Sequence, residues 1–101
     1  MQAKIIKHNH KLLTAKVGVV DCANLEAIEF FLPAVTLINL SYCTRLNSIH
    51  LKCPKLQTMI MNEVPFLNWD GKLGEEKYAR DFSNIQGKYP LDAKIVFEEY
   101  D

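Results

Sequence analysis

Residues 37–51 read LINLSYCTRLNSIHL, and their apolar side chains recur at fixed intervals. Cys43 is followed by Leu46, Ile49 and Leu51, at offsets of three, six and eight residues. Apolar and polar residues alternate over the last of these positions, which is typical of a strand with one buried face. The stretch therefore predicts a turn at Cys43 followed by a strand whose inward side includes Ile49 and Leu51.

The same offsets recur in four segments of the chain, whose first residues are 10, 11 and 10 positions apart. These segments start at Cys22, Leu32, Cys43 and Cys53. Two half-repeats therefore make a unit of 21 residues. Pro33 and Pro54 agree with this unit, because each follows the start of a second half by one residue.

The pattern weakens toward both ends. Counting eleven residues backward predicts a degenerate first strand around Val17. Counting forward reaches Val64, and Asp70 then falls at a position that should be apolar. We therefore predict a repeat region over residues 12–69, with about three coils, within one domain that comprises residues 1–101.

A nine-residue pattern, L-x-x-L-x-L-x-x-C, is formed by Val35, Ile38, Leu40 and Cys43. It resembles the cysteine-containing type of leucine-rich repeat. That resemblance covers residues 12–69 and implies a solenoid that serves as a recognition surface. In one departure from the family, the second half of the unit, CPKLQTMIM at residues 53–61, is strand-like instead of helical. We therefore expect both sides of each coil to be extended, in a flattened, leucine-rich-repeat-like β-solenoid.

The region after the repeat carries two further signals. Residues 75–85 place apolar side chains, including Phe82 and Ile85, at helical spacing behind acidic residues, and predict an amphipathic helix. Residues 93–97, AKIVF, alternate as a strand does. We therefore predict a mainly β fold with a helical cap, in which residues 70–101 form the cap.

Charge and hydropathy limit the partners and the location. Twelve basic and twelve acidic residues cancel, and the basic residues are scattered along the chain. A nucleic acid or an acidic membrane requires a concentrated positive field, so we expect neither as a partner. The first residues lack the apolar stretch of a signal peptide. We expect a cytoplasmic protein or, since bacterial effectors carry similar repeats, one delivered into the cytoplasm of a host.

Cysteine and histidine residues are the candidates for catalysis and metal binding. Cys43 or Cys53 could pair with His50 as nucleophile and base. However, the cysteines occupy turn positions of the repeat, where a small buried side chain packs against the next coil. His8 and His10 lie two residues apart but have no third ligand nearby. We predict no catalytic residue, no metal ligand and no cofactor, with a small Cys/His-dependent enzyme as the alternative function.

The candidate binding surface is the outward side of the second-half strands. The repeat turns Leu37, Asn39, Thr58 and Ile60 outward, and two of these residues are apolar. Exposed apolar patches mark interaction sites. Alternatively, the C-terminal strand or helix folds back over the same patch. We predict that these four residues bind a partner, in a non-catalytic protein–protein interaction module.

The N-terminal segment predicts an open end. Ile5 and Ile6 indicate an incomplete strand that leaves the first coil without a cover. We therefore expect this edge to pair with a second copy, giving a homo-oligomer, or with a neighbouring protein. A third hypothesis is an architectural fragment that assembles by stacking end to end.

Overall fold

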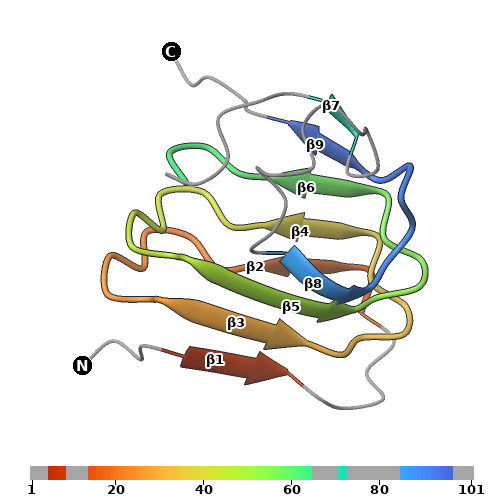
Figure 1. The fold of residues 1–101 in the computed structure, drawn as a ribbon, viewed down its shortest axis with the longest axis horizontal. Coiled ribbons are helices and arrows are strands. Elements are labelled where there is room, and N and C mark those ends of the chain that lie inside the picture. The colour runs from red at the N-terminus through yellow and green to blue at the C-terminus, as the bar shows by residue number, and fades with distance from the viewer. Residues whose placement is uncertain (1–4, 9–13, 65–70, 73–84, 97–101) are drawn as a thin grey trace.

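The computed structural model describes residues 5–8, 14–64, 71–72 and 85–96 of the 101-residue chain. Regular structure within these ranges consists of strands, which form two sheets that lie face to face (Figure 1). The described ranges hold no helix, and so none that is long and apolar enough to cross a membrane. The prediction of a mainly β fold is confirmed.

Successive strands of the chain alternate between the two sheets, apart from the short strand β7. The first sheet is parallel and contains, in spatial order, β1 (Ile5–His8), β3 (Ala27–Phe30), β5 (Ser48–Lys52) and β8 (Ile85–Lys88). The second contains the parallel strands β2 (Lys16–Gly18), β4 (Leu37–Asn39), β6 (Thr58–Ile60) and β9 (Lys94–Val96), followed by the antiparallel β7 (Gly71–Lys72). The strands of the two sheets point in opposite directions in Figure 1.

Neighbouring strands are aligned by the 21-residue spacing of the sequence. In the first sheet Ile28 lies beside Ile49, and in the second sheet Ile38 lies beside Met59. Paired parallel strands lie about 4.7–4.9 Å apart, so each apolar side chain stacks on its counterpart in the next strand. The predicted ladder of inward side chains is therefore confirmed, and so is the extended form of both halves of the unit.

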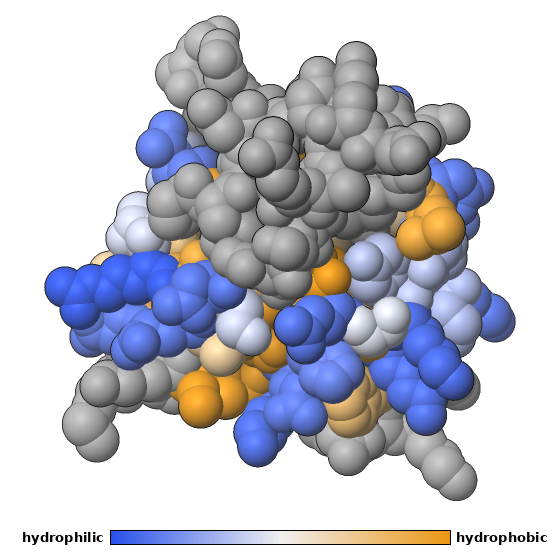
Figure 2. Space-filling model, in the orientation of Figure 1, coloured by the Kyte–Doolittle hydropathy of each residue, from blue (hydrophilic) through white to orange (hydrophobic). Residues whose placement is uncertain are grey.

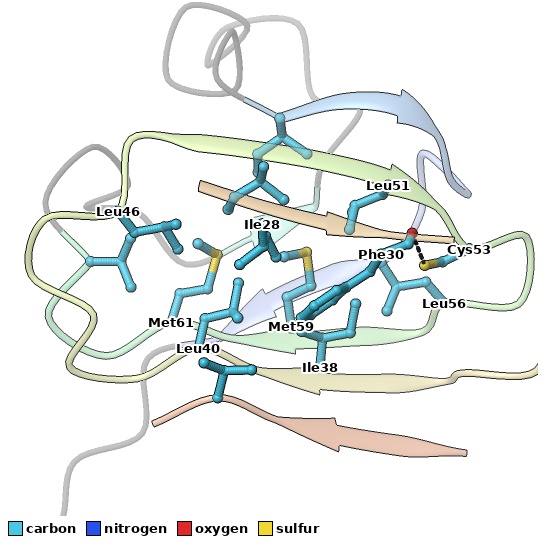
Figure 3. Close-up of a cluster of buried hydrophobic side chains, with 14 of the residues drawn as sticks. Ile28, Phe30, Ile38, Leu40, Leu46, Leu51, Cys53, Leu56, Met59 and Met61 are labelled. Atoms are coloured by element: carbon cyan, nitrogen blue, oxygen red, sulfur yellow. Dashed lines mark hydrogen bonds between the residues drawn. The ribbon is translucent and has the colours of Figure 1, made fainter. Parts of the chain in front are cut away.

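The core lies between the sheets, where inward side chains from both meet (Figure 3). Its fully buried members include Ile28, Phe30, Ile38, Leu40, Ile49, Leu51, Met59 and Met61. Burial of a side chain of this size contributes roughly 1.5–3 kcal/mol, against the conformational entropy lost when its strand is ordered. Because the strands are only two to five residues long, they depend on one another for stability.

A main-chain hydrogen bond closes the turn that begins each half of the unit. The N–H of Leu46 donates to the carbonyl oxygen of Cys43 at 3.1 Å, and that of Leu56 donates to Cys53 at 3.2 Å. A turn of this kind joins residue i to residue i+3. It therefore explains the offset of three between each start position and the first buried apolar residue.

The 21-residue spacing extends to backbone conformation. Asp21, Tyr42 and Glu63 have positive φ angles of 59°, 65° and 58°, and are 21 residues apart. Residues with a Cβ seldom adopt the left-handed region, since it costs them roughly 1–2 kcal/mol. The same turn is therefore built three times, and at Tyr42 it directs the N–H to the Asn62 carbonyl oxygen at 2.7 Å.

The N-terminal edge agrees with the predicted open end as far as the chain is described. Within that part, β1 and β2 each have a neighbouring strand on one side only. The side chain of Ile5 is 55% exposed, although it belongs to a strand. Pairing of this edge with a second copy stays a prediction.

One prediction about the C-terminal region is wrong: the strands within residues 85–96 continue the two sheets instead of capping them. β8 aligns Ile85 with Ile49, and β9 aligns Ile95 with Met59. The described chain therefore has four successive strand pairs, where about three coils were predicted. Both alignments span 36 residues, 15 more than the 21-residue spacing. The extra residues lie between β6 and β8, and hide the continuation from a count in steps of ten or eleven.

The predicted helix over residues 75–85 is also not supported. Its last residue, Ile85, is the first residue of β8, and the other residues of that stretch lie outside the described ranges. By contrast, the strand predicted over residues 93–97 is confirmed as β9, with Ala93 and Ile95 buried.

Candidate functional site

The four residues predicted to bind a partner lie side by side on the second sheet. Leu37 aligns with Thr58, and Asn39 aligns with Ile60. Leu37, Asn39 and Thr58 are half-buried, whereas Ile60 is only 8% exposed. Ile60 is also separate from the core cluster, as its outward position requires. The predicted grouping is therefore present, but Ile60 is not open to a partner in this conformation.

Asn39 has a structural role within this group. Its Oδ1 accepts hydrogen bonds from the backbone N–H of Ser41 at 3.0 Å and from the Ser41 hydroxyl at 2.7 Å. Both bonds hold the chain as it leaves β4, which is a common use of an Asn side chain. The accessible part of the predicted surface is therefore reduced to Leu37 and Thr58.

The thiols of Cys43 and Cys53 are buried in the core and bonded to backbone. The Cys43 thiol donates to the Val19 carbonyl oxygen at 3.2 Å, and the Cys53 thiol donates to that of Phe30 at 3.2 Å (Figure 3). His50 is exposed on the outward side of β5, so the structure does not join it to either thiol. Burial raises the pKa of both thiols, and protonated thiols are poor nucleophiles.

Thiol alkylation tests this arrangement. We expect the half-buried Cys22 to react with iodoacetamide first in the folded protein, and Cys43 and Cys53 to react only after unfolding. Because their pKa values are raised, any native reaction of the two buried thiols should begin at a higher pH than that of a free cysteine. Mass spectrometry of peptides from a labelling time course gives the order. Cys22→Ser should remove the fast-reacting thiol, and rapid native labelling of Cys53 would contradict the prediction.

The histidine pair gives no site in the described chain. His8 is the last residue of β1, and His10 lies outside the described ranges. Among the described residues, no three His, Cys, Asp or Glu side chains are grouped so that they could hold a metal ion.

A surface groove, missed by the sequence analysis, lies where β3, β5 and β8 end. It has a volume of about 310 Å³ and is lined by Phe31, Pro33, Lys52, Pro54 and Lys88. Phe31 and Lys52 are 21 residues apart, as are Pro33 and Pro54, and Lys88 aligns with Lys52. The groove is therefore a row of equivalent positions from successive strand pairs. The 21-residue spacing could have revealed four of its residues, but Lys88 required the fourth pair.

The groove joins an apolar floor to two cations. The half-buried Phe31 ring meets the His50 ring edge-on, with centroids 5.4 Å apart and an interplanar angle of 80°. Lys52 and Lys88 are exposed on adjacent parallel strands, and neither forms an ion pair within the described chain. The face over β3 and β5 accordingly mixes hydrophobic patches with hydrophilic side chains (Figure 2).

Such a set of groups can hold a ligand that has an apolar part and an anionic part. The ring of Phe31 and the rings of Pro33 and Pro54 offer contact area, and the two ammonium groups offer charge. Comparisons with protein-family models, with curated proteins and with solved structures find no match to this chain.

Proposed function

We propose that the chain is a non-catalytic protein–protein interaction module built on a short leucine-rich-repeat-like solenoid. The alternation of strands between two sheets and their 21-residue register support the solenoid part of this proposal. The groove at Phe31 is the observation that carries the binding part. In a scaffold of this kind, equivalent positions form rows along the surface, and such rows commonly serve for recognition.

The geometry favours binding over the alternative Cys/His-dependent enzyme. A thiol enzyme needs an accessible thiolate next to a base. Here Cys43 and Cys53 are buried and bonded to carbonyl oxygens, while His50 packs edge-on against Phe31. The groove instead presents exposed groups that are suited to contact and charge recognition.

Affinity capture with matched variants tests the proposal. The tagged full chain should retain a defined protein from native lysate, identified by mass spectrometry, and Phe31→Ala should lose it. Lys55→Ala, an exposed change outside the groove lining, should retain it. Leu37→Asp tests the surface predicted from the sequence. Circular dichroism and thermal unfolding of each variant verify that the fold is kept.

The pattern of losses locates the binding surface. Loss with Phe31→Ala alone supports the groove. Loss with Leu37→Asp alone keeps the function but moves it to the second sheet. Capture of the same proteins by both variants and the wild type would contradict specific binding at either surface.

A further inference from the structure

We infer that the groove binds an acidic segment of the partner as an extended peptide. A carboxylate of the peptide lies between Lys52 and Lys88, and a neighbouring apolar side chain rests on Phe31. This inference rests on the proposed function and adds the chemistry of the partner. The argument has three parts, which concern the charges, the floor of the groove and the size of the ligand.

The charges are the first part. Lys52 and Lys88 are direct partners in the register of β5 and β8, so two ammonium groups leave neighbouring strands from matching positions. Like charges directly opposite each other destabilise a sheet. The ion pair between Lys7 and Glu29, with Nζ and Oε2 3.5 Å apart, is on the same sheet, yet neither groove lysine has a carboxylate partner in the described chain. A carboxylate supplied by a ligand relieves the repulsion between the two lysines.

The floor of the groove is the second part. Phe31 contributes an aromatic ring, and Pro33 and Pro54 contribute side chains that have almost no rotational freedom. Rigid apolar groups lose little entropy when a ligand covers them, so they favour binding. The floor lies next to the lysines, which means that the ligand needs its apolar group close to its anionic group. Acidic and apolar residues that alternate along an extended peptide meet this requirement.

The size of the ligand is the third part. A volume of about 310 Å³ is at the lower limit of ligand pockets and accommodates one or two side chains. A nucleic acid would need many phosphate contacts, whereas this groove has two lysines and the chain has a formal net charge of zero. A carboxylate-bearing peptide fits both the volume and the charge.

Peptide binding by fluorescence anisotropy tests this inference on the full chain. The probes are a labelled peptide of alternating Glu and Phe, the same peptide with Gln in place of Glu, and the same peptide with Lys in place of Glu. We expect the Glu peptide to bind about fivefold or more tightly than the Gln peptide, as two exposed ion pairs allow. Added salt should reduce this preference.

Lysine variants connect the preference to the groove. Replacing both Lys52→Gln and Lys88→Gln should make the Glu and Gln peptides bind equally. Lys52→Glu combined with Lys88→Glu should transfer the preference to the Lys peptide. Lys55→Gln, an exposed lysine outside the lining, is the matched control and should leave the preference for the Glu peptide unchanged.

Three results would overturn the inference: equal binding of the Glu and Gln peptides to the wild type, an equal loss with Lys55→Gln, or displacement of the Glu peptide by inorganic phosphate at matched concentration. The proposed function is judged separately. A partner that is captured by the wild type and lost with Phe31→Ala supports that function even when acidic peptides show no preference. Acidic-peptide binding without any captured partner would support the chemistry alone.

Discussion

Replacing Ile49 by alanine is expected to destabilise the protein by about 2–5 kcal/mol. Ile49 is fully buried on β5, which lies between β3 and β8, and it stacks on Ile28 and Ile85. Truncation removes apolar area from the core and leaves a cavity between both neighbours, because short strands tied on either side cannot collapse into it. For a domain of this size, such a loss is a large share of the total stability.

Urea denaturation followed by circular dichroism measures this effect. The control is Ser48→Ala, an exposed change one residue earlier on the same strand, which is expected to stay within about 0.5 kcal/mol of the wild type. The midpoint should fall for Ile49→Ala with little change in slope. Equal midpoints for the two variants would contradict the inward orientation of Ile49 and the ladder that depends on it.

Replacing Gly87 by alanine is expected to cost more than about 2 kcal/mol, through strain at a position that only glycine accommodates. Gly87 has a φ of 105°, a conformation that residues with a Cβ rarely adopt. A Cβ at this position would also overlap the carbonyl oxygen of Leu51 and lie 2.8 Å from Cδ2 of His50. Because Gly87 pairs with Leu51, the substitution forces β8 away from β5.

Gly18→Ala is the matched control for this effect. Gly18 lies on β2, and a Cβ added there would meet no atom within 4 Å. Alanine at Gly18 should leave stability unchanged or raise it by up to about 1 kcal/mol, because the unfolded chain loses freedom. Thermal unfolding of both variants gives the comparison. A Gly87→Ala protein as stable as the Gly18→Ala protein would show that β8 does not pair with β5 as described.

The sequence predicted the strands and the ladder because both depend on local periodicity. A side chain on a strand faces inward at every second residue, so Ile49 and Leu51 could be assigned to the core from their spacing alone. The 21-residue unit then assigned their neighbours, and Ile28 lies where that spacing places it. The turn at Cys43 is equally local, since one hydrogen bond to Leu46 closes it.

The groove could be predicted only in part. Phe31 and Pro54 belong to the 21-residue pattern, and their alignment with Lys52 and Pro33 follows from it. Lys88 does not, because 15 additional residues separate its strand pair from the previous one. Once a long insertion interrupts the count, sequence spacing carries no information about which strand the chain will rejoin.

The sequence by itself determined the inward and outward faces of the strands, the 21-residue register and the mainly β class. Each of these follows from side-chain periodicity, which is a property of neighbouring residues along the chain. Only the tertiary structure decided that β8 and β9 rejoin the sheets, that Ile60 is buried on an outward face and that Lys52 meets Lys88. These features depend on contacts between segments far apart in sequence, where burial and hydrogen bonding across the fold outweigh local pattern.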